Sequence, residues 1–276
     1  MIFQILDDRK ECFGVYSEGE FIYDRIPHNV TGTWSWNPHL SDVAIDFANI
    51  YTGGRSFDEV CPDDLKLRFK KREEKIKAFI NAAVNAKINI ANHCMFDIIP
   101  EQHLKHYCEV KNEICSHVFE NYDKPPNHQF MVDLFEMAHD VSKNSVIVDR
   151  EPLKKASKHD GKARTLLELV DRKNTRILYD IWGSKTGRLT TKQGSFPIMN
   201  LKKELANCVV PKNDLFVQFD LNGAEIRTLL SLSTGTHPHE DIHEFNMKNV
   251  YRGIGTRDKA KKRFFAWLYN PNSEDY

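Results

Sequence analysis

The chain has 276 residues, of which 41% are hydrophobic and 28% are charged, a composition typical of a soluble globular protein with one large core or two smaller ones. It contains no apolar run of about eighteen residues and no signal-peptide pattern at its start, so we expect no membrane partner and a cytoplasmic location (host cytoplasm if viral). The formal net charge is zero, and six cysteines without a Cys-x-x-Cys pair indicate reduced thiols.

The first part of the chain predicts a small α+β domain. Two short apolar segments, residues 12–16 and 21–23, flank a Ser-Glu-Gly-Glu turn and predict a hairpin. The spacing of apolar residues then predicts a helix over 64–84 and a short strand over 87–90. We assign residues 1–99 to this domain, whose role the sequence does not indicate.

A mainly helical region follows, over residues 100–180. Apolar residues recur at helical spacing over 101–120 and again over 127–141, with a Lys-Pro-Pro break between them. Two helices joined by such a turn predict an antiparallel pair. A brief strand over 146–148 and a helix over 151–171 complete the region.

An apolar run ends in a carboxylate further along the chain. Residues 215–219 have the length and composition of a buried strand, Asp220 follows directly, and residues 224–232 have helical spacing. A strand that ends in a carboxylate before a helix is a common way to hold a metal ligand on a rigid element. Taken alone, however, Asp220 fits better a surface residue that caps the next helix.

Four residues near the end of the sequence recur every four positions: Arg257, Lys261, Phe265 and Tyr269. On a helix they form one stripe of two cations followed by two aromatic rings. Cations one turn apart can hold a triphosphate, and the rings can pack on a sugar and a base. Taken alone, the stripe also fits an amphipathic helix with buried rings and solvated cations.

Together these motifs resemble the family A DNA polymerases. The resemblance rests on the segment Thr186-Gly187-Arg188-Leu189 with Asn200-Leu201 beyond it, on Asp220, Glu225 and Arg227, on Asp241-Ile242-His243, and on Arg257, Lys261, Phe265 and Tyr269. Their order and intervals agree with the family's primer–template segment, first catalytic motif and fingers helix.

The resemblance implies a two-metal magnesium site. Asp220 would hold both Mg²⁺ ions through its carboxylate, and the Leu221 carbonyl would be a further ligand. Glu225 would exclude a ribose 2′-hydroxyl. The activity implied is template-directed DNA synthesis, in which dNMP is added to a primer 3′-hydroxyl by phosphoryl transfer.

The resemblance also implies the contacts with substrate. Arg257, Lys261 and His243 would bind the triphosphate of a dNTP, and Lys261 would donate a proton to the leaving pyrophosphate. Phe265 would lie near the sugar and Tyr269 near the templating base. Primer–template DNA would be contacted by Thr186, Arg188 and Asn200 without recognition of its base sequence. Arg188 would reach the minor groove.

The fold expected from this resemblance is an α+β right-hand polymerase fragment. It comprises the small N-terminal α+β domain, a helical thumb over 100–180, and the start of palm and fingers over 181–276. Residues 151–276 carry 22 Lys and Arg against 15 Asp and Glu, a net charge of +7, which leaves −7 for residues 1–150. This basic half suits a polyanionic partner.

The sequence departs from the family pattern in several places. Leu221, Asn222 and Gly223 replace the usual Tyr-Ser-Gln, and the two glycines of the fingers helix are Ala266 and Asn270. These changes indicate a divergent, phage-type branch. The largest departure is that the family's last motif, a His-Asp-Glu type hairpin that carries the second metal carboxylate, has no counterpart.

Two interpretations stay open. In the first, the chain belongs to a split or truncated polymerase and is competent only with a C-terminal polymerase segment or subunit. The strand at 215–219 would then have an open edge, and Phe264, Trp267 and Leu268 would be partly exposed. In the second, the chain is a non-catalytic nucleic-acid-binding protein derived from a polymerase.

Overall fold

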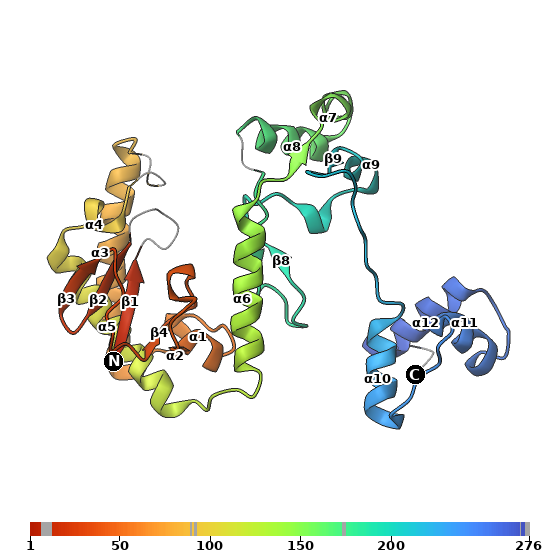
Figure 1. Ribbon diagram of the computed structural model, residues 1–276, viewed down its shortest axis with the longest axis horizontal. Coiled ribbons are helices and arrows are strands. Elements are labelled where there is room, and N and C mark those ends of the chain that lie inside the picture. Colours follow the sequence, from red (N-terminus) through yellow and green to blue (C-terminus); the bar gives the residue numbers. More distant parts are fainter. Residues whose placement is uncertain (7–12, 89, 91–92, 173–174, 271, 274–276) are drawn as a thin grey trace. The chain divides into compact units, whose positions relative to one another are not determined.

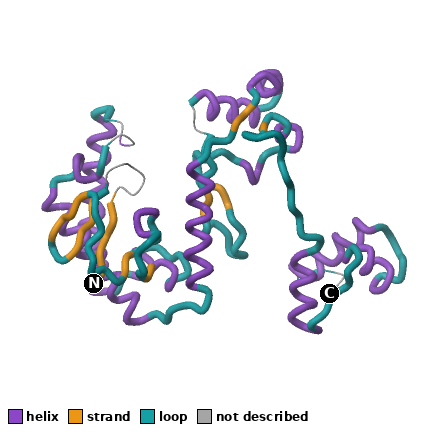
Figure 2. Tube along the Cα trace, viewed as in Figure 1, coloured by secondary structure: helices purple, strands orange, loops and turns teal. Residues whose placement is uncertain are grey.

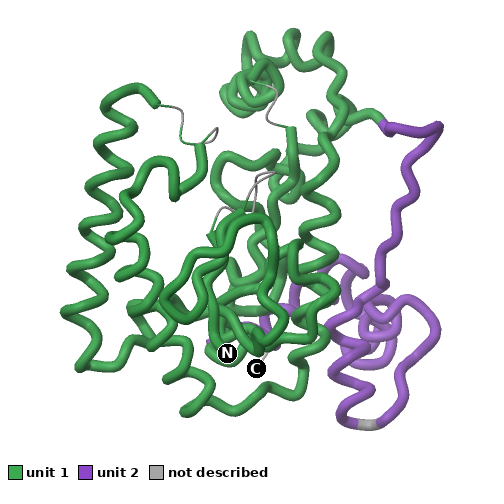
Figure 3. Tube along the Cα trace, turned by 60° about the vertical axis from the view of Figure 1, so that its left-hand side comes forward, with its two compact units in different colours: residues 1–210 green, residues 211–276 purple. Residues whose placement is uncertain are grey.

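A computed structural model describes residues 1–6, 13–88, 90, 93–172, 175–270 and 272–273. The fold is mixed α+β, as expected, with many helices and small sheets (Figures 1 and 2). The chain divides into two compact units, residues 1–210 and 211–276, which Figure 3 shows in different colours. The predicted boundaries at 99/100 and 180/181 both fall within unit 1.

Unit 1 begins with a five-stranded sheet in the order β3-β2-β1-β4-β5. The strands are β1 (Ile2–Leu6), β2 (Gly14–Ser17), β3 (Glu20–Tyr23), β4 (Gly32–Thr33) and β5 (Asp46–Phe47). The first three strands are antiparallel, whereas β4 and β5 run parallel to β1. The predicted hairpin is confirmed: Ser17 pairs with Glu20 across a two-residue turn in which both residues have positive φ, as such turns require.

Two long helices pack with this sheet. They are α3 (Asp63–Asn85) and α5 (Glu101–Asn121), which confirm the helices predicted over 64–84 and 101–120. α5 packs against both β1 and α3, because its apolar residues form a fully buried stripe that includes Leu104, Cys108 and Ile114. Short helices connect these elements: α1 (Ala48–Tyr51), α2 (Phe57–Val60), α4 (Met95–Ile98) and the 3-10 turn η1 (Pro38–Leu40).

The predicted helix over 127–141 is confirmed as α6 (His128–Lys143), but its predicted pairing with α5 is wrong. α6 packs against α1 and β7 (Tyr179–Asp180), while α5 covers the sheet. Met131 and Ala138 of α6 join the apolar cluster that contains Phe3 and Trp36. The strand predicted over 87–90 is also absent at Lys87, Ile88 and Ile90; residue 89 lies outside the described residues.

Most of the remaining elements of unit 1 surround a further apolar cluster, which contains Leu153, Leu166 and Phe196. The remaining elements are β6 (Ile147–Val148), α7 (Arg150–Ser157), α8 (Gly161–Asp171), β8 (Thr190–Thr191), η3 (Ile198–Asn200), α9 (Lys203–Ala206) and β9 (Val209–Val210). β6 confirms the brief strand and pairs with β9. The single helix predicted over 151–171 is wrong, because Asp160 accepts a hydrogen bond from the Lys162 amide at 2.8 Å and so caps a new helix.

Unit 2 consists of short helices. They are α10 (Ala224–Thr234), α11 (Ile242–Phe245), the π-helical turn η4 (Asn246–Val250) and α12 (Arg257–Tyr269). The strand predicted over 215–219 is wrong: these residues lie in no strand, and Phe219 is 91% exposed. The expected partial exposure of Phe264, Trp267 and Leu268 is confirmed.

The structure also bears on membrane-spanning helices and on the state of the cysteines. Among the described residues, no helix has the length and apolar character needed to cross a bilayer. Cys61, Cys108, Cys115 and Cys208 are buried free thiols, as the cysteine spacing predicts. Cys94 is an exception to the expected thiol state, because it is disulfide-bonded.

Candidate functional site

Helix α12 displays the predicted stripe of cations and rings. Thr256 caps the helix by accepting a hydrogen bond from the Lys259 amide at 3.3 Å, so the helix starts at Arg257. The ring of Phe265 lies parallel to that of Tyr269, with centroids 6.0 Å apart. Lys261 is exposed, and its amine makes no ion pair within the described residues. An ammonium group and two rings are therefore available along one face of α12.

Asp241 is the centre of the polar contacts in unit 2. Its carboxylate accepts two hydrogen bonds from Arg257, from Nε at 3.1 Å and from Nη2 at 2.8 Å. It also caps α11 by accepting from the amides of His243 and Glu244 at 3.0 and 2.9 Å. These bonds, with the Arg257 bonds contributing most, hold the pKa of Asp241 well below its usual range.

The loop after Asp220 joins this centre. Asn222 donates from Nδ2 to Asp241 at 2.7 Å. Gly223 has a φ of 58°, and a Cβ built there would come 2.3 Å from Cγ2 of Ile242. Glycine is therefore required at 223 both by its backbone conformation and by this close approach.

Arg227 fastens α10 to the loop that leads to Asp241. Its guanidinium donates to the Asn222 carbonyl at 2.7 Å and to the Glu240 carbonyl at 2.6 Å, and it also contacts the carbonyl of Pro238. A guanidinium has five N–H donors, so one side chain can hold several carbonyls in place. Arg227 thus has a structural role that its place in the motif did not reveal.

His243 is buried between α11 and α12. It is 3% exposed, its Nδ1 has no partner within the described residues, and its ring centroid lies 6.0 Å from that of Phe265. Burial, assisted by the positive charge of Arg257, lowers the pKa of His243, so the ring is neutral at neutral pH. Nδ1 of His243 is therefore a buried hydrogen-bonding group without a partner among the described residues.

The predicted metal ligands are less well supported by geometry. Asp220 and Leu221 are exposed, and Glu225 is half-buried in the first turn of α10. Within the described ranges, no group of three or more His, Cys, Asp or Glu side chains is placed to share a metal ion. The described residues therefore do not form a two-metal site by themselves, and no reaction step can be derived through Mg²⁺ from them.

The three residues expected to contact DNA belong to unit 1. Thr186 and Arg188 lie in the exposed turn between β7 and β8, where the Ser184 hydroxyl accepts from both their amides at 3.2 and 3.1 Å. Gly187 has a φ of 73°, which completes the turn. Asn200 ends η3 and is exposed. All three are open to solvent, as a DNA contact requires.

Sequence reasoning missed the residues that link the motifs. In the sequence, Asn222 stands out only as a departure from the usual serine, and Asp241 only as part of a triplet. A carboxylate followed at once by an apolar residue and a histidine does give an N-cap signal, which predicts the α11 start. Nothing in the sequence marks the partner of Asn222, because that contact spans nineteen positions of a loop and a helix.

The contacts in unit 2 thus bring together three of the motifs that carry the resemblance: the loop after Asp220, the Asp241–His243 triplet and α12. No family model, curated protein or solved structure matches this chain.

Proposed function

We propose that this chain is part of a template-directed DNA polymerase of the family A type, in which α12 binds the incoming dNTP. Lys261 would contact the triphosphate, with His243 beside it, and the rings of Phe265 and Tyr269 would pack on sugar and base. Thr186, Arg188 and Asn200 would contact primer–template DNA through its backbone and minor groove.

The observation that carries the proposal is the hydrogen-bonded series Asn222–Asp241–Arg257. Polymerase chemistry needs a carboxylate and a triphosphate-binding helix in a fixed relation, because misplacement of reacting groups by about 1 Å costs roughly a hundredfold in rate. In this chain, side-chain hydrogen bonds of 2.7 and 2.8 Å connect the loop next to Asp220 to the first turn of α12. An ordinary amphipathic helix needs no such connection.

A second polypeptide segment is part of the proposal. Asp220 is the carboxylate that the resemblance assigns to the reaction, and two-metal catalysis needs more than one. Leu215, Phe216 and Val217 are each more than 60% exposed, and they precede the proposed catalytic carboxylate. Burying such apolar area is worth about 25 cal/mol per Å². These residues support docking of a segment that supplies the missing carboxylate.

Binding of dATP tests the role of α12. Lys261→Ala should weaken binding several-fold, because it removes a cation from the triphosphate. Lys262→Ala is the matched control: Lys262 is the next residue, equally exposed, and lies off the stripe. Isothermal titration calorimetry measures both. Equal losses in the two variants would show that the stripe has no special role and would contradict the proposed dNTP site on α12.

Primer extension tests the need for a second segment. The purified chain should not extend a primer, while it should still bind primer–template DNA with an affinity that falls steeply with salt. Template-dependent extension by the chain alone, lost in Asp220→Ala, would mean that a second carboxylate is already present. DNA binding without dNTP binding at α12 would instead favour a polymerase-derived, non-catalytic DNA-binding protein.

A further inference from the structure

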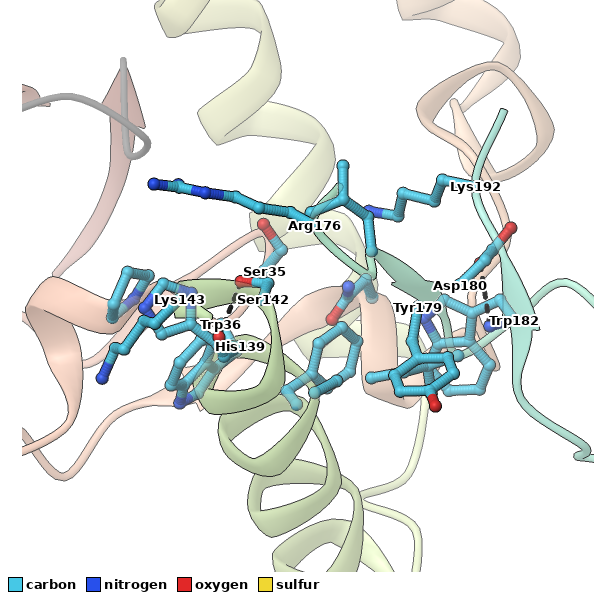
Figure 4. Close-up of a pocket in the computed structure, with 16 residues that line it drawn as sticks. Ser35, Trp36, His139, Ser142, Lys143, Arg176, Tyr179, Asp180, Trp182 and Lys192 are labelled. Atoms are coloured by element: carbon cyan, nitrogen blue, oxygen red, sulfur yellow. Dashed lines mark hydrogen bonds between the residues drawn. The ribbon is translucent and has the colours of Figure 1, made fainter. Parts of the chain in front are cut away.

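Unit 1 contains a cavity of about 480 Å³ that none of the motifs above accounts for. It lies between α6, the segment around Trp36 and the β7–β8 hairpin (Figure 4). Its aromatic lining consists of Trp36, Phe135, His139, Tyr179 and Trp182. Figure 4 shows Trp36 and His139 on one side and Tyr179 and Trp182 on the other. Both the volume and the lining fit a small ligand with a planar ring.

Two polar groups in this lining have no hydrogen-bond partner in the described part of the chain. They are Oδ1 of Asn49, a residue that is 8% exposed, and Nε1 of Trp182. Leaving a buried polar group unpaired costs about 1–3 kcal/mol. The pair provides one acceptor and one donor, and the Asn49 amide can turn to present either of its polar atoms. Both atoms have less than 1 Å² of accessible surface, so a ligand in the cavity pairs with them only after the two side chains rotate toward it.

The charges around the cavity favour an anion. Arg176 and Lys192 are exposed lining residues, and neither forms an ion pair within the described residues. Lys143 pairs with Asp140 at 2.6 Å, but both side chains are 60% exposed, so this pair is weak and easily exchanged. One carboxylate, Asp180, lines the cavity, and its Oδ1 accepts from the Trp182 amide at 3.1 Å.

These features exclude simpler ligands. An aliphatic ligand would leave Asn49 and Trp182 unpaired. An organic cation is attracted by aromatic rings, but here it would meet three cationic side chains against one carboxylate. A ligand with both a heteroaromatic ring and a negative charge uses the rings, the unpaired polar groups and the cations together.

We propose that this cavity binds a nucleotide. The base stacks on the aromatic rings of the lining, and its edge pairs with Asn49 and with Nε1 of Trp182 once these side chains turn toward it. The phosphate is held by Arg176 and Lys192. The nucleotide is supplied either as a free mononucleotide or as one residue of a single-stranded nucleic acid. Stacking of a base on an aromatic side chain contributes about 1–3 kcal/mol.

Calorimetric titration of the full chain with dAMP, deoxyadenosine and inorganic phosphate tests the site. The dAMP should bind at least about tenfold more tightly than either fragment, since only it engages rings and cations together. The double variant Arg176→Ala/Lys192→Ala should lose this preference. Trp182→Phe keeps an aromatic ring but removes the donor, and it should weaken dAMP binding. The control is Arg164→Ala, an exposed cation on α8 outside the cavity.

A 5′-phosphorylated, single-stranded adenine octanucleotide separates the two sources. Much tighter binding than dAMP identifies a nucleic-acid strand, whereas equal binding identifies a free nucleotide. Equal affinity for dAMP and deoxyadenosine, or cavity variants that bind like Arg164→Ala, would overturn the proposal, as would no dAMP binding at millimolar concentration. Thermal melting verifies that each variant is folded. Only the cavity variants should lose the preference for dAMP over deoxyadenosine, so failure of this proposal is distinct from failure of dATP binding at α12.

Discussion

Unit 1 packs its buried apolar side chains into four clusters, whereas the described residues of unit 2 contribute to none of them. The fully buried apolar side chains of unit 2 include Ile226, Ile242 and Ala260, and around them Asn222 and Asp241 form hydrogen bonds with their neighbours. Unit 1 is therefore stabilised mainly by apolar burial, and unit 2 depends far more on directed polar contacts. Directed contacts fix geometry closely but stabilise weakly.

Core truncation in unit 1 is the change expected to have the largest effect. Phe196 is fully buried among Leu153, Leu166 and other apolar residues. Phe196→Ala should destabilise unit 1 by about 3–5 kcal/mol. Phe219→Ala in unit 2, where the ring is 91% exposed, should change stability by less than about 0.5 kcal/mol. Urea unfolding followed by peptide-resolved hydrogen exchange measures each unit. Similar losses in both variants would break the contrast between the units.

A smaller effect is expected at Gly223, where unit 2 is most closely packed. Gly223→Ala introduces a Cβ 2.3 Å from Cγ2 of Ile242 at a positive φ, and it should destabilise unit 2 by about 2–4 kcal/mol. Gly235→Ala is the matched control, because its φ is 74° but no atom lies within 4 Å of the added Cβ. It should cost only about 1 kcal/mol. The same exchange measurement checks both, and equal costs would mean that Ile242 moves freely.

Acid should weaken unit 2 through Asp241. Its pKa is lowered in the folded state, so its contribution to stability is complete above the unfolded pKa, about 3.9, and is lost as pH falls through the lower, folded value. Asp241→Asn can still cap α11 but lacks the charge. Compared with the unchanged chain, unit 2 of the Asp241→Asn variant should be slightly less stable at pH 7 and less sensitive to acid below about pH 4. Hydrogen exchange in unit 2 at pH 3 and pH 6, corrected for intrinsic rates, measures this; identical acid sensitivity in both proteins would contradict it.

The sequence predicted best those elements that carry their own signal. The helices α3, α5, α6 and α12 have helical spacing over several turns, and the β2–β3 hairpin has its turn residues. The sequence predicted least well the elements that form only when another segment pairs with them. Residues 215–219 have the composition of a buried strand, but a strand forms only where another supplies hydrogen bonds, and no described residue does so.

The candidate sites show the same contrast between features with a local sequence signal and features that depend on packing. The stripe on α12 follows from four-residue spacing alone, and the break between α7 and α8 was available in the Asp160–Gly161 pair, an N-cap signal that the apolar spacing concealed. In contrast, the cavity residue Asn49 is more than a hundred positions from Arg176 and Trp182, and none of the three belongs to a motif. Their proximity depends on how α6 and the β7–β8 hairpin pack, which composition and spacing do not report.

The exposed run at 215–219 also affects how the chain behaves at high concentration. Short segments of high β-propensity without proline or charge pair readily with copies of themselves. Here the run contains no charge, but Asp214 and Asp220 stand directly at its two ends and Lys212 lies just before it. Flanking charges of this kind slow self-association by repulsion between aligned copies. Asp220, the carboxylate proposed for chemistry, is therefore also expected to protect the chain from aggregation.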